Sequence, residues 1–134
     1  MPSVTVKRHS LQTMSEQSFT NAVLDWAKVY GWRRFHVRNS GARGISQVQG
    51  DKGFPDLVLV KGSRLIFAEL KVGKEQPKPE QLAWLADLGV IGMADVTTFN
   101  ESPKSQFIPT LTTPETYVWR PEQWSEILVV LARK

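Results

Sequence analysis

The chain has 134 residues and a net charge of +4 at pH 7, with 41% hydrophobic and 22% charged residues. This length suits one domain with a buried core. The absence of cysteine excludes disulfides and thiolate metal sites, and no apolar run approaches the roughly 18 residues of a membrane span. We therefore expect one domain in the cytoplasm without a membrane partner, while the positive charge permits a polyanionic partner without demonstrating one.

The first segments read as a tail and a helix. Residues 1–13 predict a flexible basic tail ahead of a single domain over 14–134. Thr13-x-x-Glu16 has the capping-box pattern, with Ser15 as a competing cap, and Gly31 is the expected stop. Between them, apolar residues recur at helical spacing. The stripe consists of Phe19, Ala22, Val23, Trp26, Ala27 and Tyr30.

Residues 33–39 alternate, with Phe35 and Val37 on one face and basic side chains on the other, which predicts a half-exposed strand. A Gly-rich loop follows over 40–53. The stretch GFPDLVLVKGSRLIFAELKV, residues 53–72, then reads as two apolar strands around a two-residue turn at Gly62-Ser63. Both faces of this hairpin are apolar, which places it at the centre of a covered sheet.

The remainder predicts a helix from Pro79 to Leu88, an irregular insertion at about 90–116, a short strand at 116–119 and a final helix from near Pro121. Gly89 closes the first of these helices. The order helix, strand, hairpin, helix, strand, helix predicts an α/β fold with a mixed central sheet flanked by helices. The inward-facing residues of the two helices are Trp84, Leu85 and Leu88, then Trp124, Ile127, Leu128 and Leu131.

Three charges interrupt the apolar hairpin: Asp56, Glu69 and Lys71. Counting back from the turn places Asp56 opposite Glu69, where Cβ atoms lie about 4.5–5.5 Å apart. Lys71 projects from the same face as Glu69 because side chains alternate. Two opposed carboxylates need a cation between them. Lys71 supplies it in a structural ion cluster, and a divalent metal such as Mg²⁺ is the other solution; geometry alone leaves both open.

The helices favour a site over a structural cluster. Glu16 lies three residues before Phe19 and so extends the buried stripe of its helix, and Gln81 stands in the same relation to Trp84. Two polar residues ending apolar faces, beside a charged cluster on the sheet they cover, indicate parts of one site.

Pro55-Asp56, twelve intervening residues and Glu69-Leu70-Lys71 match the pattern of the PD-(D/E)xK nucleases. The fuller set of segments resembles the virus-type replication-repair nuclease domain (VRR-NUC), over about residues 15–89 and 117–128. These segments are SEQSF, GWRRFHVRNS, GFPDLVLV, LIFAELKV, EQLAWLADLG and YVWRPEQW. The insertion at 90–116 departs from the family pattern, in which helix passes quickly to strand.

The resemblance implies a restriction-endonuclease-like core and a Mg²⁺- or Mn²⁺-dependent endonuclease acting on DNA. Asp56, Glu69 and the Leu70 carbonyl would bind metal, with Glu16 helping to hold the metal or its waters. Lys71 would activate the attacking water, and we expect a bound cation to depress its pKa. Gln81 corresponds to the family's helical glutamine near the lysine.

We expect a branched or flapped duplex as substrate, in a bacterium or a phage-infected host. A homodimer would place two sites on one junction, and five tryptophans suit an aromatic interface. A solvated basic face is the plain alternative for the positive residues, and a non-catalytic nucleic-acid-binding module is the alternative function. The predicted DNA-contacting residues are Arg33, Arg34, His36, Arg38, Arg43, Lys52 and Lys74.

Overall fold

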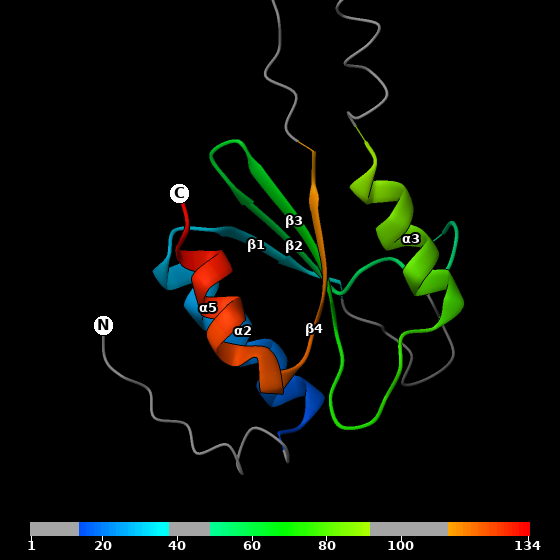
Figure 1. Cartoon of the computed structure of the whole chain (residues 1–134), viewed down its shortest axis with the longest axis horizontal. Helices are drawn as coiled ribbons and strands as arrows, with labels where there is room; N and C mark the ends of the chain where they lie inside the picture. The colour runs from blue at the N-terminus through cyan, green and yellow to red at the C-terminus, as the bar shows by residue number, and fades with distance from the viewer. Residues whose placement is uncertain (1–13, 38–48, 92–112) are drawn as a thin grey trace, which may run out of the picture.

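A computed structural model of the protein describes residues 14–37, 49–91 and 113–134. It has a mixed sheet of four strands in the order β1-β2-β3-β4, in which β3 and β4 are parallel and the other pairs antiparallel. Figure 1 shows the helices around this sheet. The elements are α2 (Glu16–Val29), β1 (Arg33–His36), β2 (Leu57–Lys61), β3 (Arg64–Leu70), α3 (Pro79–Gly89), β4 (Glu115–Trp119), a 3₁₀ turn (Pro121–Gln123) and α5 (Trp124–Ala132).

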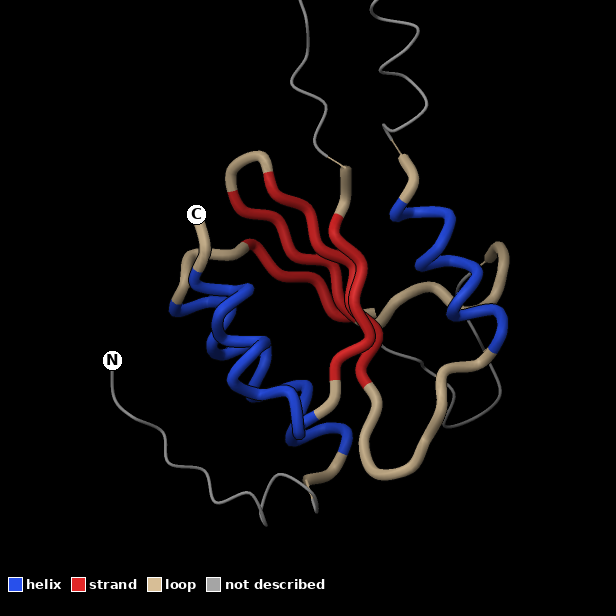
Figure 2. Tube along the Cα trace, in the orientation of Figure 1, coloured by secondary structure: helices blue, strands red, loops and turns tan. Residues whose placement is uncertain are grey.

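The sheet lies between two layers of helix, as the sequence predicted (Figure 2). Helices α2 and α5 cover one face, and α3 packs on the other, against a smaller cluster that includes Phe67 and Val58. Strand β3 is buried from Ile66 to Leu70, which confirms a hairpin at the centre of a covered sheet. The main core contains Phe19, Val23, Ala27, Trp32, Leu57, Leu59, Ile66, Ala68, Leu70, Trp119, Trp124, Ile127 and Leu131.

The helices begin and end close to the residues that the sequence predicted. Ser15 caps α2, since its hydroxyl accepts from the Ser18 backbone N–H at 3.1 Å. Helix α3 runs one residue past the predicted end, to Gly89. The final helix is preceded by a 3₁₀ turn at Pro121 and becomes α-helical only from Trp124. The predicted tail and most of the predicted insertion at 90–116 lie outside the described residues.

Strand β1 is more exposed than its alternation predicted. It is an edge strand that pairs only with β2 in the described sheet. Phe35 lies opposite Val58, on the face that α3 partly covers, yet its side chain is 63% exposed. The five tryptophans, by contrast, pack within the chain: Trp32, Trp119 and Trp124 are buried, and the other two are half-buried. The tryptophan content therefore gives no support to the predicted homodimer.

A charged network joins β3, β4 and α5 at the end of the sheet where the hairpin turns. The Arg64 guanidinium makes two 2.8 Å hydrogen bonds to the Glu115 carboxylate and donates to the Val130 carbonyl. Trp32 Nε1 donates to the Leu131 carbonyl at 2.9 Å, so donors satisfy two of the last carbonyls of α5. Neither this helix nor any other in the described ranges has the length and apolar character needed to cross a bilayer.

Candidate active site

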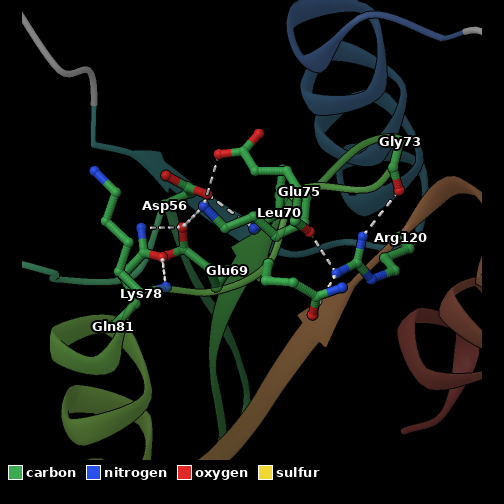
Figure 3. Close-up of polar contacts among 10 residues, drawn as sticks. Asp56, Glu69, Leu70, Gly73, Glu75, Lys78, Gln81 and Arg120 are labelled. Carbon is green, nitrogen blue, oxygen red and sulfur yellow. Dashed lines mark hydrogen bonds and ion pairs between the residues drawn. The ribbon is translucent and has the colours of Figure 1, made fainter.

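The register of the hairpin brings the predicted charges together. Lys61 pairs with Arg64 and Leu57 with Ala68, as counting from the two-residue turn predicted. Asp56 directly precedes β2 and therefore lies across from Glu69. The Asp56 carboxylate accepts a 2.8 Å hydrogen bond from the Leu70 backbone N–H, and Figure 3 shows both acids at the same end of the sheet. The sequence prediction that these charges converge is confirmed.

Glu69 is a buried acid, and within the described chain only one of its two carboxylate oxygens has a hydrogen-bond partner. Its residue is 1% exposed. Oε1 accepts from Gln81 Nε2 at 2.8 Å and lies 3.4 Å from Lys71 Nζ. Oε2 is buried and has no hydrogen-bond partner among the described residues. Burial and the Asp56 carboxylate raise the pKa of Glu69 to about 8, against the opposing effect of Lys71. The pair of acids thus retains a proton near neutral pH, at a position that a cation would also satisfy.

Lys71 is nearly as buried, at 4% exposed, and stands between two acids. Besides Glu69, its ammonium contacts Glu75 Oε1 at 3.2 Å. Burial lowers the pKa of Lys71, but Glu75 and Glu69 outweigh this effect, and its pKa lies above the ordinary value. The rise follows from the two carboxylates beside the lysine, and the depression expected beside a bound cation stays a prediction.

Gln81 belongs to the cluster, as predicted. Its amide oxygen accepts from the Lys78 backbone N–H at 2.8 Å, which fixes the side chain so that Nε2 reaches Glu69. The loop before β2 packs directly on this turn of α3. Gly53 has φ +95°, and a Cβ there would lie 2.6 Å from the Glu80 carbonyl carbon. Only glycine fits that position without displacing the helix that carries Gln81.

Glu16 reaches the site in a different way from the one predicted. It is exposed, not an extension of the buried stripe, because it is the first residue of α2 and the core begins with Phe19, one turn later. It nevertheless shares a cavity of about 510 Å³ with Asp56. That cavity is lined by Glu16, Gln17, Thr20, Asn21, His36, Val37 and Asp56.

The carboxylates suit a divalent metal that keeps much of its water. Within residues 14–37, 49–91 and 113–134, no group of three or more histidine or acidic side chains is placed to hold a metal ion. The donors are the opposed carboxylates of Asp56 and Glu69, one of them with an unpartnered oxygen. Mg²⁺ commonly binds through one or two carboxylates plus waters and phosphate oxygens, so this donor set fits Mg²⁺ or Mn²⁺.

Sequence reasoning missed two members of the site, Glu75 and Arg120. Glu75 contacts the Lys71 ammonium, and Arg120 donates to the carbonyls of Gly73 and Glu75 (Figure 3). The signal that could have identified Arg120 was its position directly after a strand. Arg120 directly follows β4 as Lys71 follows β3, and residues that follow parallel neighbours meet at one edge of a sheet.

The predicted DNA-contacting residues are spread over the surface. His36 lines the cavity, whereas Arg33 lies opposite Val60, roughly 13 Å along the sheet from the level of Asp56. The Arg34 guanidinium donates to the Leu24 carbonyl. Lys52 and Lys74 are exposed, and Arg38 and Arg43 lie outside the described residues.

Comparison with known proteins gives no match: no family model, no curated protein and no solved structure resembles this chain significantly.

Proposed function

We propose that this chain is a divalent-metal-dependent DNA endonuclease with a restriction-endonuclease-like core of the VRR-NUC type. The observation that carries the proposal is the cluster of the half-buried Asp56 with the buried Glu69 and Lys71. Its acids face each other, and the raised pKa of Glu69 makes the ionised pair unfavourable without a cation. A proton shared with Asp56 satisfies Glu69 while Glu69 is neutral, and a cation would take the place of that proton once Glu69 ionises, because Glu69 Oε2 has no other partner in the described chain.

The resemblance gives each residue a part that its position allows. Asp56 and Glu69, with the Leu70 carbonyl, would hold Mg²⁺ or Mn²⁺, and Glu16 faces the same cavity from α2. The bound metal would supply charge neutralisation and a more acidic water. Lys71 would donate a hydrogen bond to the attacking water or to a phosphate oxygen. Gln81 keeps the Glu69 carboxylate in place through its 2.8 Å hydrogen bond.

DNA is the substrate that the charge balance favours. The chain carries 17 basic and 13 acidic residues, and the cavity of about 510 Å³ beside Asp56 has the size of a ligand site and opens next to His36. A branched or flapped duplex is the preferred subtype, carried over from the resemblance. A homodimer would provide the two active sites that a symmetric cut requires.

Cleavage of a labelled panel tests the proposal: duplex, single strand, flap and four-way junction, each with Mg²⁺, Mn²⁺ or EDTA. We expect cutting only with the metals, and loss of cutting in Asp56→Asn and Glu69→Gln. Glu115→Gln is the matched control, since Glu115 is an acid of the neighbouring strand that pairs with Arg64 away from the cluster. Binding of DNA without cutting under any condition would favour the non-catalytic module.

Light scattering at micromolar concentration, with and without junction DNA, tests the dimer. A monomer mass in both conditions would leave single-strand nicking or flap cleavage as the activity.

A further inference from the structure

Lys71 is held on two sides. Its ammonium has three N–H donors, and the described residues offer it two carboxylates, Glu69 at 3.4 Å and Glu75 at 3.2 Å. Glu69 belongs to β3, and its buried carboxylate is also held by Gln81. Glu75 belongs to the connector between β3 and α3, and its side chain is 50% exposed. The orientation of Lys71 therefore depends on how firmly that connector is fixed.

The connector begins with a tight turn that has few ties of its own. Gly73 has φ +61°, and the Glu75 N–H donates to the Val72 carbonyl at 3.3 Å, a long hydrogen bond. Residues 73–76 are all exposed. Chain of this kind opens easily, because it buries little apolar surface.

Arg120 supplies the missing ties from another part of the fold. Its Nη2 donates to the Glu75 carbonyl at 2.6 Å and its Nη1 to the Gly73 carbonyl at 3.2 Å (Figure 3). The arginine is itself well placed, since Trp119 accepts from the Lys71 backbone N–H at 3.0 Å and the Arg120 N–H donates to Gln123 Oε1. The guanidinium thus joins the end of β4 to the connector that carries Glu75.

We infer that Arg120 and Glu75 are positioning residues for Lys71. The two hydrogen bonds from Arg120 fix the backbone at 73–75, and this keeps the Glu75 carboxylate against the Lys71 ammonium. The inference rests on the proposed nuclease function for its consequence. The ammonium then faces an acid on each of two sides, which leaves its third N–H for the attacking water or a phosphate oxygen. Both terminal guanidinium nitrogens donate to the connector, and Nη2 also lies 3.5 Å from Gln76 Oε1, so we assign Arg120 a role through the connector and not on DNA.

A double-mutant cycle tests this route. Arg120→Ala and Glu75→Ala should each lower kcat about ten- to a hundredfold with KM for DNA nearly unchanged. The kcat of the double variant should be no lower than that of the less active single variant, because both substitutions remove the same support of Lys71. Arg120→Lys keeps the charge but cannot bridge two carbonyls as a planar guanidinium does, so we expect it to lose nearly as much kcat as Arg120→Ala.

Two results would overturn the inference. Effects on kcat that multiply in the double variant would mean that the residues act independently. A raised KM in Arg120→Ala that Arg120→Lys restores would make Arg120 a DNA contact.

Hydrogen exchange separates this inference from the proposed function. The Glu75 amide should exchange at least about tenfold faster in Arg120→Ala and Arg120→Lys than in the wild type. Arg64→Ala is the matched control, because Arg64 also bonds backbone carbonyls but at the opposite end of β3, and it should leave that amide unchanged. A wild-type chain that cuts no DNA would disprove the proposed function. Unchanged exchange of the Glu75 amide in the Arg120 variants would disprove that Arg120 fixes the connector.

Discussion

Replacing Glu69 by glutamine should stabilise the protein, and the gain should grow with pH. The pKa of Glu69 rises from an ordinary value of 4.5 to about 8 on folding. A raised pKa means that the folded state binds the proton more tightly than the unfolded state. The stability linked to this proton is complete below about pH 4.5, falls as the pH rises and reaches its lowest value above about pH 8. Glutamine, which has the same shape and no proton to lose, removes that fall.

The magnitude follows from the shift. At about 1.4 kcal/mol per pKa unit, the stability linked to this proton falls, relative to acid solution, by roughly 1 kcal/mol at pH 5, ~3 kcal/mol at pH 7 and up to ~5 kcal/mol above pH 8. The Lys71 contact is already part of this shift, because Lys71 opposes the rise in the pKa of Glu69, and it is not subtracted a second time. The testable quantity is therefore the slope, ~1 kcal/mol or more per pH unit, and not the absolute difference at one pH.

Urea unfolding in EDTA, followed by tryptophan fluorescence at pH values from about 5 to 9, measures both variants. Glu115→Gln is the control of opposite sign, since hydrogen bonds from Arg64 lower the pKa of Glu115. Its removal should destabilise the protein at neutral pH, with the loss shrinking in acid. Saturating Mg²⁺ should stabilise the wild type by ~3 kcal/mol at a hundred times Kd and the Gln variant much less. A difference between Glu69→Gln and wild type that stays constant from about pH 5 to pH 8 would refute the assignment of a raised pKa.

The other predictions concern the lysine, the loop and the basic surface. Lys71→Ala should abolish turnover and leave the Kd for DNA within about twofold, because one of 17 basic residues contributes little to phosphate attraction. Fluorescence anisotropy in Ca²⁺ measures this Kd. A loss of binding as large as the loss of cutting would make Lys71 a docking residue. Gly53→Ala should lower the free energy of unfolding by well over the ~1–2 kcal/mol of left-handed backbone strain and should reduce kcat. Gly62→Ala, with open space around it, should show the strain alone, and equal effects in the two variants would contradict the close packing. Replacing Arg38 and Arg43 together should flatten the log–log salt dependence of duplex binding by up to about two units, and an unchanged slope would move the DNA path elsewhere.

The hairpin was predictable because its rules are local. A two-residue turn fixes the register, so Gly62-Ser63 alone places Asp56 across from Glu69, and alternation adds Lys71. The buried stripes of the helices follow from their period in the same way. Glu16 shows the limit of that reasoning. Periodicity gives the angle of a side chain around the helix but not whether that side chain is covered at its height along the axis, and Glu16, the first residue of α2, is exposed.

Arg120 and Glu75 could not be found by local rules. The contact joins positions 45 residues apart and exists only because β4 pairs with β3 in parallel, so that both strands end at the same edge. The sequence predicts a short strand at 116–119 without specifying its neighbour or its direction. Once that direction is known, a residue directly after β4 must lie beside Lys71, and a long donor such as arginine reaches the connector beyond it.

Folding favours the charged form of an acid at one end of β3 and β4 and disfavours it at the other. This contrast distinguishes an acid that stabilises the fold from one that does not. At the hairpin-turn end, Arg64 meets Glu115 in a two-pronged ion pair 2.8 Å long, and the pKa of Glu115 is lowered, so folding favours its charge. At the other end, five residues along β3, Glu69 is buried with an unpartnered oxygen, and folding disfavours its charge. The same strands are therefore able to pair an acid well. A chain that needed only stability would gain by placing an apolar residue at Glu69, since a buried acid facing another acid costs several kcal/mol. The acid at that position is best explained by the cation that the proposed reaction requires.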